Sequence, residues 1–416
     1  MDEKLYPQRW IILAVLFVVL CILQFSVILT PGIATIIMPE YGFTPAQFGI
    51  ICNMPFLAGV LFGILSGSLG DRYGTKIVML IGLIIFVAGA FWRVFATDFI
   101  SLCISSLVMG FALATLNSNS TKVIRLWFPG KAMGPAMGVY VCGACIGASV
   151  ALKMGPSFAK SADAFLACAY AAVATLLIWF FLFRNHPDGE KSEEESSLQQ
   201  IKSVLKEKNV WLISIMIFFV FGCSTTAQTY MNAGLAEYGS GNIEFASTIS
   251  AVSAIFVAIG SIIMPAIIAK FKKLRPVMLM LCIAQFIVLC LVFILPFGIP
   301  TLILMFFMGL FLGGMLAMGK AIPALLPNIN PRDLGAVGGV QSTFQNIGAW
   351  CVAGYIIAPI CQVLIPGNVY FGIYVGAGIC ALLAGLTVML LPEMPTSLDA
   401  KIKMEEMGNT AANQNT

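Results

Sequence analysis

Long apolar runs, each followed by a short polar stretch, divide this chain from end to end. A helix needs about 20 apolar residues to cross the roughly 30 Å of hydrocarbon in a bilayer. Backbone amides in hydrocarbon must be hydrogen-bonded within their own segment, so each run is expected to be a helix. The predicted spans are 10–33, 46–69, 77–97, 100–125, 133–155, 162–184, 209–234, 244–269, 276–295, 300–323, 334–360 and 369–391.

A polar break after the sixth run separates two helical units. The predicted organisation is a bundle over 1–185, a linker over 186–208, a bundle over 209–392 and a tail over 393–416. The linker and the tail are rich in charged and polar residues, so the tail and the first half of the linker are expected to be disordered. The predicted fold class is an all-α membrane protein with two pseudo-symmetric six-helix bundles.

An internal repeat supports two related halves. Lys122 and Lys320 are each followed seven residues later by a proline. Five further residues then align with five in the second half at one constant offset: Gly134, Gly138, Ile146, Gly147 and Ala148 with Gly335, Gly339, Ile347, Gly348 and Ala349. Parallel halves related by an axis along the membrane normal place a substrate path at the interface between them.

Composition and charge agree with a membrane protein. Of 416 residues, 59% are hydrophobic and 10% are charged, whereas a soluble domain carries about 25% charged residues. Lysines and arginines gather in the loops on one side, and the opposite loops carry essentially only Lys160. This bias predicts a multi-pass cell-membrane protein with both termini and the linker in the cytoplasm. The net charge of +4 therefore indicates orientation rather than binding to nucleic acid.

Little in the spans suggests catalysis or a metal. The only histidine, His186, lies in the linker, and the acidic residues lie in loops, tails or helix ends. Cys142 and Cys145 form a Cys-x-x-Cys pair in a glycine-rich span, which we interpret as small-residue packing rather than a metal or redox site. The chain is expected to be no enzyme and to need no cofactor or metal.

The loop between the second and third predicted spans carries a motif. It reads Gly67-Ser-Leu-Gly-Asp71-Arg72-Tyr73-Gly74-Thr75-Lys76. In sequence and place it resembles the signature loop of the major facilitator superfamily, although Thr75 stands where a basic residue is usual. The resemblance implies a transporter in which Gly67, Asp71, Arg72, Gly74 and Lys76 form a conformational latch, with Asp71 capping the next helix. The alternative is a charged turn that only fixes topology.

Charged side chains inside spans are functional candidates, because they are costly to insert in a membrane. Lys122 and Lys320 occupy equivalent places in the two halves and would make the vestibule between them positive, which favours an anion. Alternatively, both extend to the membrane surface or pair with acidic gate residues. Arg93 and Lys153, near outer ends of their spans, are expected to extend to the surface.

Amide side chains complete the candidate site. They fall on spans that, by the resemblance to the superfamily, line the cavity, and an amide can hydrogen-bond an oxyanion. The candidate substrate-binding residues are Gln24, Asn53, Asn117, Lys122, Gln228, Lys320, Gln345 and Asn346. The alternative role of the amides is hydrogen bonding between helices.

The segment 122–138 resembles the small-anion porters of the superfamily, of the nitrate/nitrite, cyanate and oxalate–formate types. The paired arginines of the nitrate porters are missing here. The resemblance implies a secondary transporter of a small organic or inorganic anion, working by alternating access as a monomer in the lipid bilayer. The alternatives are a transporter of neutral or amphiphilic compounds, such as a drug exporter, and a non-transporting membrane sensor.

Overall fold

The computed structural model describes residues 6–129, 132–187, 204–271, 273–326, 329 and 334–394. Within these residues, twelve helices are long and apolar enough to cross a membrane. The predicted all-α membrane fold is therefore confirmed. Each predicted span matches a helix to within about five residues, except 334–360, which covers α14 (Leu334–Cys351), η4 (Val352–Ile357) and the start of α15 (Ala358–Leu364). Most of the predicted linker (188–203) and most of the predicted tail (from 395) lie outside the described residues.

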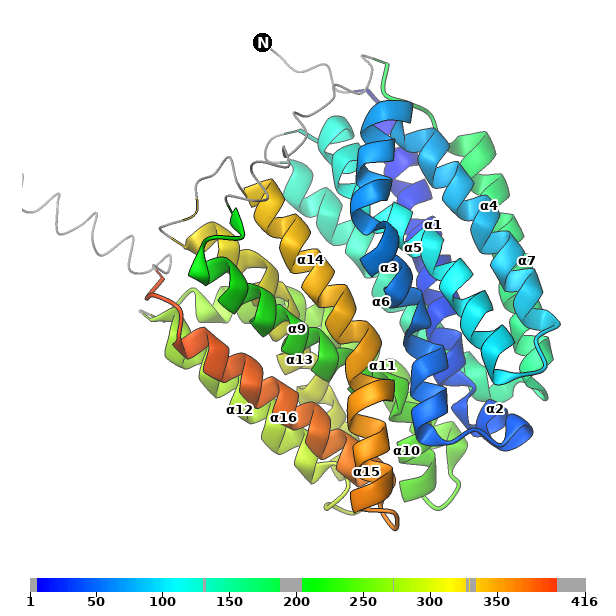
Figure 1. The fold of residues 1–416 in the computed structure, drawn as a ribbon, viewed down its shortest axis with the longest axis vertical. Helices are drawn as coiled ribbons and strands as arrows, with labels where there is room; N and C mark the ends of the chain where they lie inside the picture. Colours follow the sequence, from blue (N-terminus) through cyan, green and yellow to red (C-terminus); the bar gives the residue numbers. More distant parts are fainter. Residues whose placement is uncertain are drawn as a thin grey trace, which may run out of the picture.

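The helices group into two bundles that lie side by side (Figure 1). The spanning helices of the first bundle are α1 (Arg9–Gly32), α3 (Pro45–Tyr73), α4 (Thr75–Val94), α5 (Phe99–Trp127), α6 (Met133–Met154) and α7 (Ser161–Leu182). Those of the second are α9 (Lys208–Thr229), α11 (Ile243–Ile268), α12 (Leu274–Leu291), α13 (Ile299–Leu325), α14 (Leu334–Cys351) and α16 (Val369–Met389). Because the number of spans is even, α1 begins and α16 ends on one face, here called the terminal face. The opposite face is called the far face.

Polar side chains define where several spans begin. Thr44 accepts a hydrogen bond from the backbone N–H of Gln47, whose side chain accepts one from the N–H of Thr44, which is a capping box in front of α3. Asp98 and Asn242 cap α5 and α11, respectively, and each side chain accepts one hydrogen bond from a backbone N–H of the first turn. Each cap satisfies N–H groups that the first helical turn leaves without partners.

Two short helices on the far face were not predicted. They are α2 (Ala34–Tyr41) after α1 and α10 (Met231–Tyr238) after α9, at equivalent places in the two bundles. The sequence stays apolar across the break between α1 and α2, so hydropathy does not mark it. The ends of these spans are therefore bent rather than straight.

Glycines allow the two bundles to approach closely in the half of the membrane near the far face. A Cβ atom on Gly49 of α3 would lie 2.9 Å from the Cα atom of Gly354. Gly354 belongs to the π-helical segment η4 (Val352–Ile357) between α14 and α15 (Ala358–Leu364). Here two backbones cross in direct contact, which only glycine permits.

Near the terminal face the same helices face open space. A Cβ atom on Gly63 of α3, or on Gly335 or Gly338 of α14, would have no neighbouring atom within 4 Å. In Figure 1 the blue α3 and the orange α14 converge toward the far face and diverge toward the terminal face. The structure is therefore closed at the far face and open at the terminal face.

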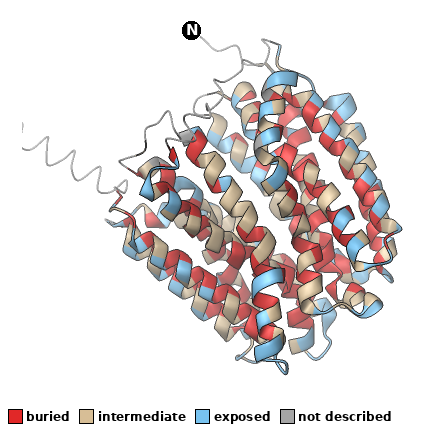
Figure 2. Ribbon diagram, in the orientation of Figure 1, coloured by how far each residue is buried: buried red, intermediate tan, exposed pale blue. Residues whose placement is uncertain are grey.

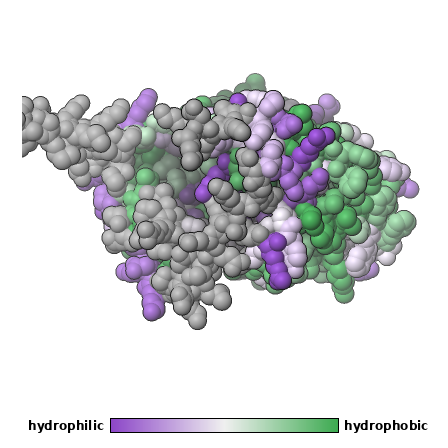
Figure 3. Space-filling model, turned by 90° about the horizontal axis from the view of Figure 1, so that it is seen from above, coloured by the Kyte–Doolittle hydropathy of each residue, from purple (hydrophilic) through white to green (hydrophobic). Residues whose placement is uncertain are grey.

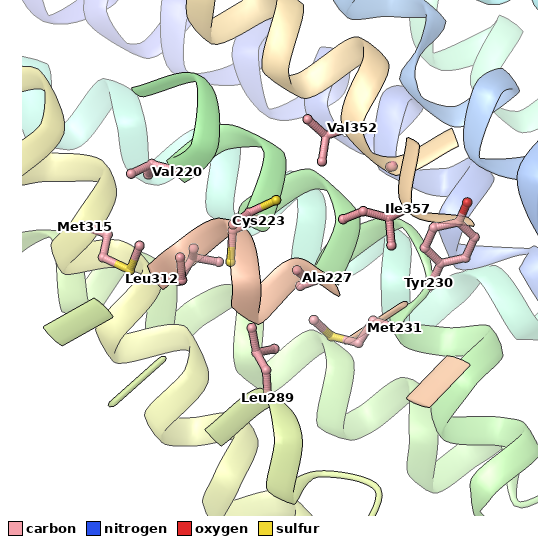
Figure 4. Close-up of a cluster of buried hydrophobic side chains, with 14 of the residues drawn as sticks. Val220, Cys223, Ala227, Tyr230, Met231, Leu289, Leu312, Met315, Val352 and Ile357 are labelled. Carbon is pink, nitrogen blue, oxygen red and sulfur yellow. The ribbon is translucent and has the colours of Figure 1, made fainter. Parts of the chain in front are cut away.

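Each bundle has a core of tightly packed apolar side chains. In the second bundle, α9 contributes Val220, Cys223 and Ala227, which pack among residues of α12, α13 and η4 (Figure 4). Figure 2 shows buried residues concentrated inside the bundles and exposed residues on the outward surfaces. Because those outward surfaces are largely apolar, they suit contact with hydrocarbon rather than water.

Arg93 does not extend to the surface, contrary to the prediction. It is 3% exposed, inside the first bundle. Its Nη2 atom donates to the Thr30 hydroxyl at 2.6 Å, and its guanidinium lies 4.6 Å from the centre of the Phe165 ring. Its Nε has no hydrogen-bond partner among the described residues. The interior of the bundle thus holds a cation through a hydroxyl and a π face.

The close crossing at Gly354 gives a first prediction. Gly354→Ala places a methyl group 2.4–2.9 Å from the Ile50 and Gly49 backbone, so we expect a loss of about 1–3 kcal/mol of stability, as for other overpacked sites. Thermal unfolding of the purified protein measures the effect. The matched control is Gly338→Ala on the same span, where the methyl group meets open space and the melting temperature should not fall. Equal losses in both variants would contradict the account.

Candidate functional site

The candidate site is the space between the bundles on the terminal side. Figure 3 looks onto the terminal face and shows hydrophilic residues gathered there, while hydrophobic residues cover the flank of the molecule. The polar side chains that reach this space come from α1, α5, α13 and α14, whereas other predicted candidates lie in the closed half.

Hydrogen bonds between the bundles close the far side beneath this space. The Asn232 amide of α10 donates to the carbonyl oxygens of both Gly32 and Leu152, at 3.0 Å each. The Tyr230 hydroxyl donates to the Pro45 carbonyl oxygen at 2.7 Å, and Lys153 Nζ donates to the Thr248 hydroxyl at 2.7 Å. Solute in the central space therefore has no open route to the far face in this conformation.

Asn53 and Gln228, two of the predicted binding residues, use their amides within the protein. Asn53 is 2% exposed. Its Nδ2 donates to the Gly49 carbonyl oxygen and to the Thr229 hydroxyl of the other bundle, at 2.8 and 3.2 Å. Gln228 Nε2 donates to Ser224 Oγ on its own helix at 2.8 Å. In this conformation Asn53 contributes to the closure rather than to an open site.

Lys320 lies on α13 and is exposed. Its Nζ is 5.6 Å from the centre of the Phe221 ring on α9, and no described residue accepts a hydrogen bond from it. The Gln341 amide of α14 donates to the carbonyl oxygen of the preceding residue, Gly319, at 2.7 Å. The ammonium group is therefore held at the junction of α9, α13 and α14 with its hydrogen-bonding capacity available to a ligand.

Lys122 differs from Lys320 although the sequence places them equivalently. It is half-buried, and its Nζ donates to the Gly67 carbonyl oxygen of α3 at 3.2 Å. Lys122 thus links α5 to the last turns of α3. Gly67 itself is not needed for close packing, since the nearest atom to a Cβ there is 3.9 Å away. Gly70 takes that role against Asn119.

Asn117 and Gln24 have no hydrogen-bond partner among the described residues. Asn117 is exposed on α5. Thr115, two positions earlier, packs against Gly82 of α4. Residues two apart point to nearly opposite sides of a helix, so Asn117 faces away from α4 and toward the other bundle. Gln24 is half-buried on α1. Both amides remain available to a solute.

Gln345 and Asn346 on α14 are half-buried and also lack hydrogen-bond partners among the described residues. The Asn346 amide lies 2.6 Å from where a Cβ on Gly59 of α3 would be. Asn346 therefore contacts the opposite bundle where the closed half meets the open terminal half. Side chains from both bundles thus meet at mid-depth.

The candidate residues lie at successive depths. At 1.5 Å per residue, Lys320 is roughly 8 Å from the terminal end of its helix, Asn117 roughly 15 Å, Asn346 roughly 18 Å and Gln24 roughly 22 Å. A cation at the entrance is therefore followed by amides toward the middle of the membrane. This order suits a small anion that first meets charge and then hydrogen-bond donors.

The loop between α3 and α4 is a tight turn around Gly74, whose φ of +86° favours glycine. Gly74 is the N-cap residue of α4, and Asp71 lies in the last turn of α3, so Asp71 does not occupy the N-cap position. The Asp71 side chain lies outside what the structure describes. Arg72 is exposed, and its guanidinium carbon lies 5.2 Å from the centre of the Tyr73 ring. The backbone carbonyl oxygen of Lys76 accepts a hydrogen bond from the indole Nε1 of Trp179.

Sequence reasoning missed three functional candidates. Phe221 presents its ring to Lys320, Ser342 is exposed on α14 one turn from Gln345, and Tyr230 joins the bundles. Phe221 and Tyr230 stand in apolar surroundings, where an aromatic residue is ordinary, so no sequence signal marks them. Ser342 could have been found from its spacing to Gln345 on one helix face.

Comparisons with known proteins point in one direction. A sequence model of the family described as Major Facilitator Superfamily matches residues 15–352. The probable nitrate/nitrite antiporter NarK1 of Thermus thermophilus is 25% identical over 85% of this chain and 86% of that protein. The sialic acid transporter NanX of Escherichia coli is 24% identical over 86% of each chain. The crystal structure of the nucleoside transporter NupG superposes with a TM-score of 0.74 at 14% identity, over 92% of this chain and 99% of that one.

The open side of the site gives a second prediction. A cysteine at the exposed position 117 (Asn117→Cys) should react several times faster with a water-soluble maleimide than one at position 119 (Asn119→Cys), which is 0% exposed. Both positions lie on α5 within two residues, so reagent depth is matched. Labelling rates of the two variants in a background without native cysteines measure this. Equal rates would show that the space between the bundles is closed to water.

Proposed function

Because the chain belongs to the major facilitator superfamily, we propose that this membrane transporter moves a small anion by alternating access, with Lys320 as the residue that attracts it. The single observation that carries the proposal is the Lys320 ammonium group, which is exposed and has no hydrogen-bond acceptor among the described residues. A lysine within a span costs a few kcal/mol on insertion scales, so an available one indicates a binding role.

The amides extend the path inward. Asn117, Gln345 and Asn346 can each donate N–H groups to an oxyanion without adding further charge. Weak, successive contacts suit a transporter, since the anion must leave the site as well as enter it. The relatives named above support the anionic class: nitrate and nitrite are anions, and sialic acid carries a carboxylate.

We infer that the terminal face is the cytoplasmic face, as the distribution of lysines and arginines predicts. The conformation is then inward-open, and the bonds made by Asn232, Tyr230 and Asn53 form the outer gate. To release or admit solute outside, these bonds and the crossing at Gly49 and Gly354 must separate while the terminal halves of α3 and α14 close. The open glycine surfaces on that side leave room for the approach.

Substitution of Lys320 gives a third prediction. A charge-assisted hydrogen bond contributes about 1.5–3 kcal/mol, so Lys320→Ala should raise the half-saturating anion concentration by about tenfold or more. Lys320→Arg, which keeps the charge, should retain part of the affinity. Proteoliposome counterflow with labelled nitrate, nitrite, formate, oxalate and cyanate measures it.

Two comparisons make this test specific. Lys270→Gln removes a basic residue from the terminal end of α11, outside the site, and should leave counterflow unchanged. A lipophilic cation should not be transported. Saturable transport of that cation, unaltered by Lys320→Ala, would overturn the proposal in favour of a transporter of amphiphilic compounds.

A further inference from the structure

A second cavity lies on the outer side of the first bundle, away from the space between the bundles. It has a volume of about 270 Å³ and is lined by Phe62, Leu65, Ser66, Leu69 and Tyr73 of α3, Ile77, Val78 and Ile81 of α4, and Phe111 and Thr115 of α5. Leu65, Ile77 and Ile81 are about half exposed, whereas Thr115 on its floor is buried. It is an apolar groove between α3 and α4 that opens toward the hydrocarbon.

Two polar features stand at fixed places along this groove. The Ser66 residue is 1% exposed, and its hydroxyl has no hydrogen-bond partner among the described residues. Arg72 is exposed at the terminal end of the groove, with its guanidinium 5.2 Å from the Tyr73 ring that lines the groove. The two residues are six positions apart on α3, which is about 9 Å along the helix.

We propose that this groove binds one acyl chain of an anionic glycerophospholipid, with the ester carbonyl at the Ser66 hydroxyl and the phosphate at Arg72. The order of chemistry in the groove matches that of the lipid: charge at the membrane surface, a hydrogen-bond donor below it, and apolar residues deeper. The volume is near the lower end for ligand pockets, about 300 Å³, so it suits one chain segment and not a whole lipid.

Charge complementarity selects the headgroup. Basic residues between spanning helices bind anionic headgroups through electrostatic attraction at the membrane surface. Ser66 supplies a second contact, because a buried hydroxyl without a partner is destabilising until an acceptor reaches it. Leu65 and Leu69 line the groove, whereas Gly67, whose carbonyl oxygen accepts the hydrogen bond from Lys122, lies on the other side of α3.

The fourth prediction concerns lipid retention by the purified full-length protein. Native mass spectrometry after exchange into an equimolar mixture of phosphatidylglycerol and phosphatidylcholine should show one phosphatidylglycerol retained. Arg72→Gln should lower the preference for phosphatidylglycerol about fivefold, the ratio expected for one basic residue near an anionic surface. Lys270→Gln, at the same face but outside the groove, should not lower it.

Two further variants test the groove itself. Leu65→Trp fills it and should abolish the retained lipid, whereas Ile262→Trp on the exposed surface of α11 should not. An ether-linked phosphatidylglycerol lacks ester carbonyls, so the wild-type protein should bind it less well than the ester lipid. The Ser66→Ala variant should bind the ether and ester lipids equally well. Thermal unfolding checks that each variant is folded. Retention that is unchanged in Leu65→Trp, or equal for the two headgroups in the wild-type protein, would overturn the proposal.

Discussion

Apolar helices gain little by leaving lipid for one another, because hydrocarbon chains are as apolar as leucine side chains. The two bundles must therefore be held together by close packing and by hydrogen bonds. Both occur in the half near the far face, where Gly49 meets Gly354 and Asn232 bridges to two carbonyl groups. The rest of the interface is free to separate, which creates the space in which Lys320 and the central amides are available.

Hydropathy predicted the spans well because the membrane imposes one length and one composition on every crossing helix. It predicted their far ends less well. The chain remains apolar from Ile33 to Ile37, although the first span has already ended and α2 has begun. Pro31 and Gly32 stand at the end of α1 and are poor helix formers, but a scan for apolar runs gives no weight to backbone preference.

In the candidate site, too, the sequence predicts which residue types are present but not the role that each residue takes. Asn53 and Asn346 are both amides in apolar spans, yet Asn53 bonds across the closed interface and Asn346 has no hydrogen-bond partner within the described part of the chain. Lys122 and Lys320 are equivalent in the repeat, yet Lys122 Nζ donates to the Gly67 carbonyl oxygen and Lys320 Nζ lies over the Phe221 ring. The role of each lysine depends on what the neighbouring helix of its own bundle presents, which is a carbonyl oxygen of α3 for Lys122 and an aromatic ring of α9 for Lys320.

The buried Arg93 has a consequence for how the first bundle assembles. Its contacts include Thr30 on the first span, Met109 on the fourth and Phe165 on the sixth. In stepwise insertion of spans into the bilayer, α4 enters the membrane before α7 has been synthesised. Arg93 lies in the last turn of α4, so its long side chain can extend to the membrane surface until the Phe165 ring of α7 covers it. Addition of α7 therefore encloses a charge of the third span, so the burial of Arg93 depends on helices from both ends of the first bundle.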